Sequence, residues 1–129
     1  MEEEYNHKLL TGNIIGAAMR VHTQLRVGFL EVVYQRCLAI ELRESGLAFE
    51  REVDLPLFYR GEQVGSRRVD FLVESTALVE LKAVGEITPL HHAQVLDYLH
   101  AYRLGVALLL NFGEPRLSCK RFINLPRSL

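Results

Sequence analysis

The sequence predicts an α/β fold in which a mixed β-sheet is flanked by helices. Two amphipathic segments open the chain, several β-like segments occupy its middle, and a helical segment followed by an unbroken apolar run comes after them. The middle segments predict an antiparallel meander, whereas a strand, a helix and a further buried strand imply a right-handed crossover between parallel strands. A chain of 129 residues is long enough for one core, so residues 1–129 are expected to form a single domain.

The first two elements are expected to be helices. Apolar residues recur at helical spacing over residues 11–26, which predicts the first helix. Gly28 interrupts that pattern, and a second helix is expected over 29–45, because Gly46 is a favourable residue just beyond a helix end. This second helix is apolar almost all round and is therefore expected to be buried.

The remaining elements follow from alternation and from turn residues. Four short β-like segments are expected at 48–54, 57–59, 67–73 and 77–84. Thr88 followed by Pro89 is typical of a helix start, so a helix is expected from there to Leu104. Residues 106–112 lack alternation, as expected for a strand covered on both faces, and a last short strand is expected over 120–124.

Composition limits the classes of protein to which the chain belongs. Hydrophobic residues make up 49% and charged residues 24%, which are ordinary values for a globular protein. The net charge of −1 gives no overall support for nucleic-acid binding, although Arg60, Arg67 and Arg68 could form a local basic patch. The apolar runs are too short to cross a bilayer and no basic signal segment is present, so we expect no membrane association and a cytoplasmic location. Cys37 and Cys119 lack metal-type spacing and are expected to be reduced.

The most informative segment is 68–84, which places charged residues inside two apolar β-like runs. If the runs form a hairpin through 74–76, Asp70 lies directly across from Glu80, with Lys82 on the same sheet face. The apolar residues are then expected together on the other face: Val69, Phe71 and Val73 on the first run, and Val79, Leu81 and Ala83 on the second.

Two carboxylates at such close range repel each other unless a cation lies between them. Mg²⁺ suits this position because it prefers a few carboxylates together with waters and phosphate oxygens. A lysine beside the ion could orient or help to deprotonate a water. The pattern therefore favours phosphodiester hydrolysis. The alternative is a half-exposed hairpin with ordinary surface charges, and spacing alone does not decide between them.

Further polar residues lie on faces expected to point inward. Glu31 shares a helical face with Tyr34 and two leucines, where an unpaired carboxylate is costly; alternatively, it favours the positive end of the helix dipole and reaches water. In the later helix, Gln94 and Tyr98 share a face with His91. They could hydrogen-bond a phosphate or a base, or belong to a plain core face.

These residues, in this order, resemble a known family. The stretch from Gly28 to Tyr34 matches a GxxExxY signature, and Asp70 followed by Glu80-Leu-Lys82 is similar to the Asp and Glu-x-Lys of the PD-(D/E)XK nuclease superfamily. Val69 stands where the superfamily name has proline. The resemblance covers nearly the whole chain, and we interpret the sequence as a member of the GxxExxY family in that superfamily.

The resemblance implies a restriction-endonuclease-like α/β core and a metal site. Asp70 and Glu80 would bind Mg²⁺ or Mn²⁺ together with the backbone carbonyl of Leu81. Glu31 would complete or orient the site, and Lys82 would assist the attacking water. Residues implied to bind nucleic acid or to support the site are Gln94, Tyr98, Tyr34, His91 and Arg68.

Two hypotheses for function follow. The first is a metal-dependent nuclease acting on DNA or RNA; the second is a non-catalytic nucleic-acid-binding or assembly module that keeps the nuclease fold. Retention of charged residues that would destabilise a fold without catalysis favours the first. A net charge near zero, with no obvious DNA-reading extension, favours the second or requires a homodimer or a partner.

Overall fold

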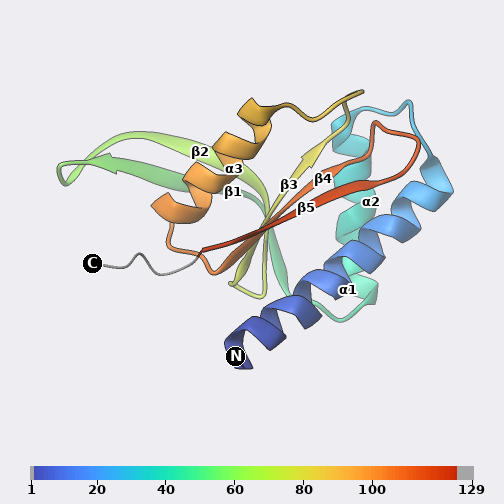
Figure 1. Ribbon diagram of the computed structural model, residues 1–129, viewed down its shortest axis with the longest axis horizontal. Coiled ribbons are helices and arrows are strands. Elements are labelled where there is room, and N and C mark those ends of the chain that lie inside the picture. Colours follow the sequence, from blue (N-terminus) through green and yellow to red (C-terminus); the bar gives the residue numbers. More distant parts are fainter. Residues whose placement is uncertain (1, 125–129) are drawn as a thin grey trace.

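The computed structural model of the protein describes residues 2–124, which form three helices and one five-stranded sheet (Figure 1). The elements in chain order are α1 (Glu2–Leu25), α2 (Glu31–Glu44), β1 (Phe49–Tyr59), β2 (Glu62–Val73), β3 (Ala77–Lys82), α3 (Pro89–Ala101), β4 (Val106–Asn111) and β5 (Ser118–Ile123). The predicted α/β class, with two N-terminal helices, a meander, a helix and a buried strand, is confirmed.

The sheet is mixed, as predicted. Its strand order is β1-β2-β3-β4-β5, with β3 and β4 parallel and every other neighbouring pair antiparallel. Helix α3 makes the crossover that parallel neighbours require. All six residues of β4 are buried, in agreement with the absence of alternation in that part of the sequence.

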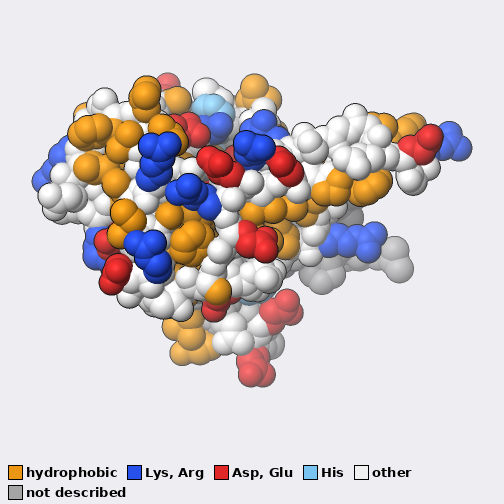
Figure 2. Space-filling view, turned by 180° about the vertical axis from the view of Figure 1, so that it is seen from behind, with side chains coloured by type: hydrophobic (Ala, Val, Ile, Leu, Met, Phe, Trp, Pro, Cys, Tyr) orange, Lys and Arg blue, Asp and Glu red, His pale blue; other side chains and the backbone are white. Residues whose placement is uncertain are grey.

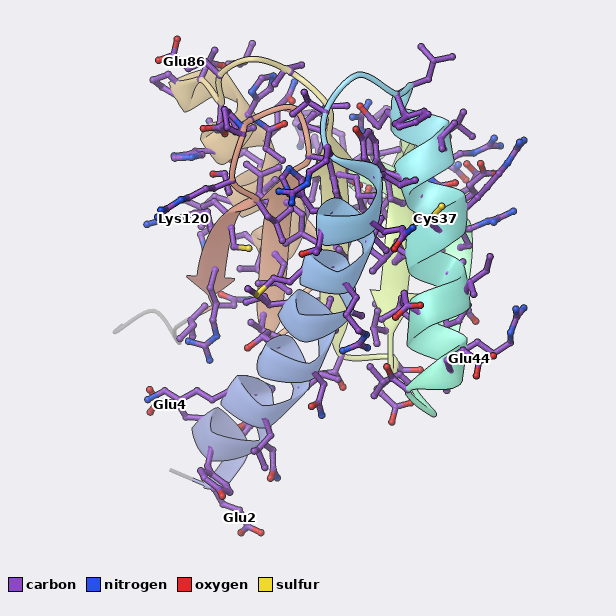
Figure 3. All side chains as sticks on the ribbon, turned by 90° about the vertical axis from the view of Figure 1, so that its right-hand side faces the viewer. Glu2, Glu4, Cys37, Glu44, Glu86 and Lys120 are labelled. Atoms are coloured by element: carbon purple, nitrogen blue, oxygen red, sulfur yellow. The ribbon has the colours of Figure 1, made fainter. Side chains whose placement is uncertain are left out.

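The sheet has a helical layer on each face. Helices α1 and α2 lie side by side over one face (Figure 3), and their apolar residues form a cluster with the inward residues of β2, β3 and β4. Helix α3 covers the other face through a second cluster. This second cluster consists of Val69, Leu78, Val95, Leu99, Ala107 and Leu109. None of the helices within residues 2–124 is both long enough and apolar enough to span a bilayer.

Helix boundaries differ from the prediction at two places. Helix α1 begins at Glu2 rather than at residue 11. Three glutamates in its first turn favour the positive end of the helix dipole, and Glu2 and Glu4 extend away from the body there (Figure 3). Helix α3 ends at Ala101 rather than at Leu104, because the backbone of Arg103 is left-handed, with φ of 53°.

Strands β1 and β2 form a long hairpin that projects from the body (Figure 1). The two segments expected at 48–54 and 57–59 are one strand, since β1 is an edge strand and an edge tolerates Pro56. Only residues 71–73 of β2 pair with β3, so the outer part of the hairpin has no third strand. The fold therefore has a projecting hairpin that the sequence did not predict.

The side-chain alternation of β2 reverses at Asp70. Val69 belongs to the cluster under α3, whereas Phe71 and Val73 belong to the cluster under α1 and α2. The prediction that these three residues share one face is therefore wrong. The physical reason is local: opposite Asp70, residue Glu52 of β1 has a left-handed backbone with φ of 54°. The strand pair is irregular at the point where the candidate metal ligand lies.

Candidate active site

Strands β2 and β3 form the predicted hairpin with the predicted three-residue loop, 74–76. The pairs from Val73↔Ala77 to Phe71↔Val79 confirm its register. Continuing that register by one position places Asp70 opposite Glu80.

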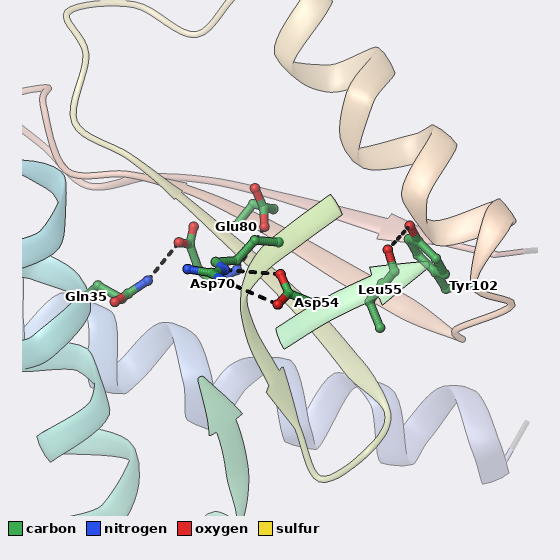
Figure 4. A network of polar contacts seen from close by, with 7 residues as sticks. Gln35, Asp54, Leu55, Asp70, Glu80 and Tyr102 are labelled. Atoms are coloured by element: carbon green, nitrogen blue, oxygen red, sulfur yellow. Dashed lines mark hydrogen bonds and ion pairs between the residues drawn. The ribbon is translucent and has the colours of Figure 1, made fainter. Parts of the chain in front are cut away.

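Beyond this point side chains replace the regular hydrogen-bond ladder between the two strands. The backbone N–H of Asp70 donates to Oε1 of Glu80 at 3.0 Å. The backbone N–H of Leu81 donates to Oδ2 of Asp70 at 2.8 Å. Each carboxylate is therefore held against the other residue's strand, and the two acids lie next to each other (Figure 4).

Burial raises the pKa of both acids. Only 5% of Glu80 is exposed, and its burial, together with the nearby charge of Asp70, raises its pKa to about 7. Burial also raises the pKa of Asp70, although hydrogen bonds from Leu81 and from Gln35 act in the opposite direction. Two adjacent acids of this kind favour binding of a cation, because a cation offsets both desolvation and mutual repulsion.

Gln35 is a site residue that the sequence analysis missed. It lies on α2, is 6% exposed, and donates from Nε2 to Oδ1 of Asp70 at 2.8 Å (Figure 4). Its Oε1 is buried without a hydrogen-bond partner among the described residues. One signal was available in the sequence: Gln35 lies four residues, or about one helical turn, after Glu31, on a helix otherwise expected to be apolar.

Glu31 is the first residue of α2 and is exposed. The leucines and Tyr34, with which it was expected to share a face, are buried, whereas Glu31 lies at the exposed start of the helix, as the helix-dipole alternative expects. Neighbouring protein atoms desolvate the carboxylate in part, and together with the charge of Asp70 they raise the pKa of Glu31. Within residues 2–124, no three acidic, histidine or cysteine side chains are arranged as a ready-made metal site.

Two cations lie close to the acids. The charges of Lys82 and Arg67 both lower the pKa of Glu31, of Asp70 and of Glu80. Alternation along β3 puts Lys82 on the same face as Glu80. Arg67 was expected only as part of a local basic patch, yet it is the arginine that the structure brings to this site.

Arg68 lies elsewhere. Its Nε and Nη2 atoms donate to the two carboxylate oxygens of Asp54 at 3.1 and 3.3 Å, and both side chains are more than half exposed. The structure therefore does not bring Arg68 to the acids.

The backbone carbonyl of Leu81 lies on the edge of β3 that faces β2. In a β-strand, the N–H and C=O of one residue point toward the same neighbouring strand, and the next residue along the chain points its N–H and C=O toward the strand on the other side. The carbonyl of Lys82 accepts from Phe112, which continues β4, whereas the N–H of Leu81 donates to Asp70. The carbonyl of Leu81 therefore faces β2.

A comparison with protein families identifies this arrangement. The family model that describes the PD-(D/E)XK nuclease superfamily matches residues 8–122 of the sequence. The chain belongs to the PD-(D/E)XK nuclease superfamily. This confirms the predicted superfamily, although the match does not distinguish the GxxExxY branch. No curated protein and no solved structure matches the chain significantly.

Other residues expected at the site of this PD-(D/E)XK protein have structural contacts. Tyr34 is fully buried, donates from its hydroxyl to the carbonyl of Arg26 and stacks on Phe112 with ring centroids 4.8 Å apart. His91 forms a capping box with Thr88 at the start of α3. Tyr34 therefore anchors the start of α2 to the preceding loop and to the segment after β4, and His91 caps the start of α3.

Gln94 and Tyr98 lie on α3 and are half-buried. The ring of Tyr98 lies beneath the guanidinium of Arg67, with 5.2 Å between Cζ and the ring centroid. Of the two residues, Tyr98 is therefore the one whose contacts link α3 to the charged groups of the site.

Proposed function

We propose that this protein is a divalent-metal-dependent nuclease that hydrolyses phosphodiester bonds in DNA or RNA. The strongest support is the adjacent pair Asp70 and Glu80, which is held by backbone amides in a position where burial raises both pKa values. Membership of a nuclease superfamily supports the same chemistry. Fold alone does not establish activity, so the proposal depends on these side chains.

The donor atoms around the pair fit a hard cation such as Mg²⁺ or Mn²⁺. They are all oxygens: the carboxylates of Asp70 and Glu80, the carbonyl of Leu81, and Oε1 of Gln35, which is buried without a partner. Hard divalent cations prefer oxygen ligands. We propose that Asp70, Glu80 and the Leu81 carbonyl hold the metal. When bound, such an ion would polarise the scissile phosphate and lower the pKa of a coordinated water.

The remaining charged residues would orient the reaction. Lys82 would hold the attacking water or stabilise negative charge on the phosphate, because its ammonium group is close enough to influence Glu31, Asp70 and Glu80. Glu31 would complete the site or orient a water from the start of α2. Gln35 would fix the carboxylate of Asp70 through the hydrogen bond to Oδ1.

We also assign the protein to the GxxExxY branch. Each signature residue has a physical role that supports the assignment. Gly28 has φ of 110°, a backbone conformation that only glycine adopts readily. The hydroxyl of Tyr34, on α2, donates to the carbonyl of Arg26 at the start of the same loop. This loop leads into α2, whose first residue is Glu31, so the signature positions one acid relative to Asp70.

The activity can be tested with labelled single-stranded, duplex and branched substrates of DNA and RNA. The protein should cleave at least one of them with Mg²⁺ or Mn²⁺ and not with EDTA. Glu80→Ala should lower the rate by more than about 100-fold, since loss of even an outer-shell partner typically costs about 10–100-fold. Glu44→Ala is the matched control, because Glu44 is an exposed acid at the end of α2. Cleavage that survives Glu80→Ala or EDTA would rule out this site.

The second hypothesis, a non-catalytic nucleic-acid-binding or assembly module, has one observation in its favour. The net charge is −1, and positive and negative side chains are interspersed over the face shown in Figure 2, whereas nucleic-acid binding needs a positive surface. A homodimer or a partner protein would supply more surface. Binding of the same substrates without cleavage, with the mass in solution measured by light scattering, would favour this hypothesis.

A further inference from the structure

We propose that Arg67 binds a backbone phosphate of a nucleic acid next to the Asp70–Glu80 pair, and that Tyr98 holds its guanidinium in place. This inference rests on the proposed function and names the residue through which the substrate is held. The contacts of Arg67, and the contrast with Arg68, support it.

Arg67 lies at the base of the β1–β2 hairpin, on the face covered by α3. It pairs with Leu55 in the register of β1 and β2, and Leu55 packs against the cluster under α3. Arg67 is therefore directed toward α3, where its guanidinium lies over the ring of Tyr98. Tyr98 is itself packed against the same cluster. An arginine held in this way loses little freedom when it binds a ligand.

The charge of Arg67 has no acidic partner in direct contact. Among the residues that the structure describes, arginines form ion pairs in Arg20–Glu41 and Arg68–Asp54, and Arg67 forms none. Its Nε atom is buried without a hydrogen-bond partner. This nitrogen is covered by protein, so the terminal amino groups of the guanidinium, which are not among the buried atoms, would contact a ligand. A phosphate oxygen is the type of acceptor that a guanidinium fork matches best.

The balance of charge at the site predicts when Arg67 can act. Three carboxylates, those of Glu31, Asp70 and Glu80, lie near two cations, Arg67 and Lys82. With all three acids ionised, the local charge is negative and repels phosphate. A divalent cation reverses the sign, so Arg67 should bind phosphate when metal is bound at the acids.

The test uses the full chain and a fluorescent single-stranded oligonucleotide of mixed sequence. Binding is followed by anisotropy in Ca²⁺, which also prefers oxygen ligands, and each sample is checked for intact oligonucleotide. Arg67→Met keeps most of the packing on Tyr98 and removes the charge. Arg68→Met removes the neighbouring charge, which lies in an exposed ion pair. Arg67→Lys keeps the charge without the planar fork.

Arg67→Met should weaken binding about 10-fold, as expected for a lost hydrogen bond to a charged group. The slope of log K against log salt should become shallower by about 0.7, the value for one phosphate contact on a single strand. Arg68→Met should leave the slope unchanged. Arg67→Lys should retain the slope with intermediate affinity. Thermal melting of each variant separates loss of binding from loss of fold.

Equal effects of Arg67→Met and Arg68→Met, or an unchanged slope in a folded Arg67→Met protein, would overturn the inference. So would failure of the wild type to bind the oligonucleotide at all. Failure of the inference about Arg67 can be distinguished from failure of the proposed nuclease function. Metal-dependent cleavage that Arg67→Met leaves intact would support the nuclease proposal and reject the role of Arg67 in binding phosphate. Binding that depends on Arg67, without any cleavage, would support that role and reject the nuclease proposal.

Discussion

At the scale of residues, the site depends on backbone amides as much as on charges. Asp70 and Glu80 lie where the β2–β3 ladder ends, and each accepts a hydrogen bond from a backbone N–H of the opposite strand. Buried N–H groups need acceptors, so the two carboxylates also serve as acceptors for backbone N–H groups that the sheet leaves without a backbone partner. This contact keeps both acids in a buried position although burial raises their pKa values.

The raised pKa of Glu80 predicts how stability depends on pH in the absence of metal. The folded protein holds the proton up to a pKa of about 7, compared with an ordinary value of 4.5. Between these two pH values the folded state therefore binds more protons than the unfolded state. The stability that protonated Glu80 contributes is present in full below pH 4.5 and is lost as pH rises through about 7. The free energy of unfolding should fall by up to about 3 kcal/mol over that interval.

Urea denaturation in EDTA at a series of pH values measures this change. Glu80→Gln cannot titrate at this position, so its free energy of unfolding should be flatter over the same interval. Above the pKa of Glu80, the variant should be the more stable protein. Parallel profiles for the two proteins would show that Glu80 titrates normally.

A second prediction at this scale concerns Gln35. Gln35→Leu removes the hydrogen bond to Asp70 and also removes the unpartnered Oε1, so the two effects on the free energy of unfolding oppose each other and the change should be within about 1 kcal/mol. Affinity for Mn²⁺, measured by calorimetry, should fall by about 10-fold, as expected for an outer-shell partner. Gln35→Glu should instead strengthen Mn²⁺ binding, because it adds a carboxylate. An unchanged Mn²⁺ affinity in Gln35→Leu would mean that Gln35 has only a packing role.

The central pair could be predicted from the sequence, whereas its neighbours could not. The register of Asp70 and Glu80 depends only on the length of the hairpin loop, which local residues determine. The spacing of Gln35 from Glu31 places both on one side of α2, but the contact of Gln35 with Asp70 depends on how α2 packs on the sheet. Arg67 rather than Arg68 reaches the site because alternation reverses between Val69 and Phe71, and this reversal is not apparent in the sequence.

At the scale of elements, the segment after β3 is fixed by close packing against the segment after β4. The side chain of Asn111 accepts from the N–H of Val84 and donates to its carbonyl, at 3.0 and 2.9 Å. A Cβ added to Gly113 would overlap the backbone of Val84. Because Val84 follows Lys82 by two residues, this contact also holds the end of the strand that contains Glu80.

Gly113→Ala should therefore destabilise the protein by about 1–3 kcal/mol, the usual cost of overpacking, because the methyl group meets backbone that cannot easily move. Gly12→Ala is the matched control. Gly12 lies within α1 with nothing near its Cβ position, so alanine there should stabilise by about 0.5–1 kcal/mol. Urea denaturation measures both. Equal effects of the two substitutions would show that the segment after β4 is free to shift.

At the scale of the whole molecule, the order and type of the elements could be predicted because each has its own periodicity or turn residues. The length of the projecting β1–β2 hairpin could not, since residues 48–54 and 57–59 were expected as two separate segments and the second long strand was expected to begin only at residue 67. Phe58, Tyr59 and Val64, at its outer end, are more than 60% exposed. The sheet topology places this hairpin next to the acids, because β2 passes directly from the outer end to Asp70.

Metal binding at the acids should stabilise the entire fold. A ligand that binds only the native state at about 100 times its Kd adds about 2.7 kcal/mol to the free energy of unfolding. For a chain of this size that corresponds to a rise in Tm of roughly 10 °C. Differential scanning fluorimetry with Mg²⁺ and with Mn²⁺ measures the shift.

Glu80→Ala should largely abolish this shift while leaving the fold intact. The substitution removes a ligand and also relieves carboxylate repulsion, so without metal the variant should be at least as stable as the wild type. Glu44→Ala, which changes an exposed acid on α2, should respond to metal as the wild type does. This comparison separates a specific site from general ionic effects on the native state. If millimolar Mg²⁺ and Mn²⁺ shift all three proteins equally and no nucleic acid is cut, Asp70, Glu80 and Lys82 form only a charged stripe on the sheet, and the nuclease proposal fails.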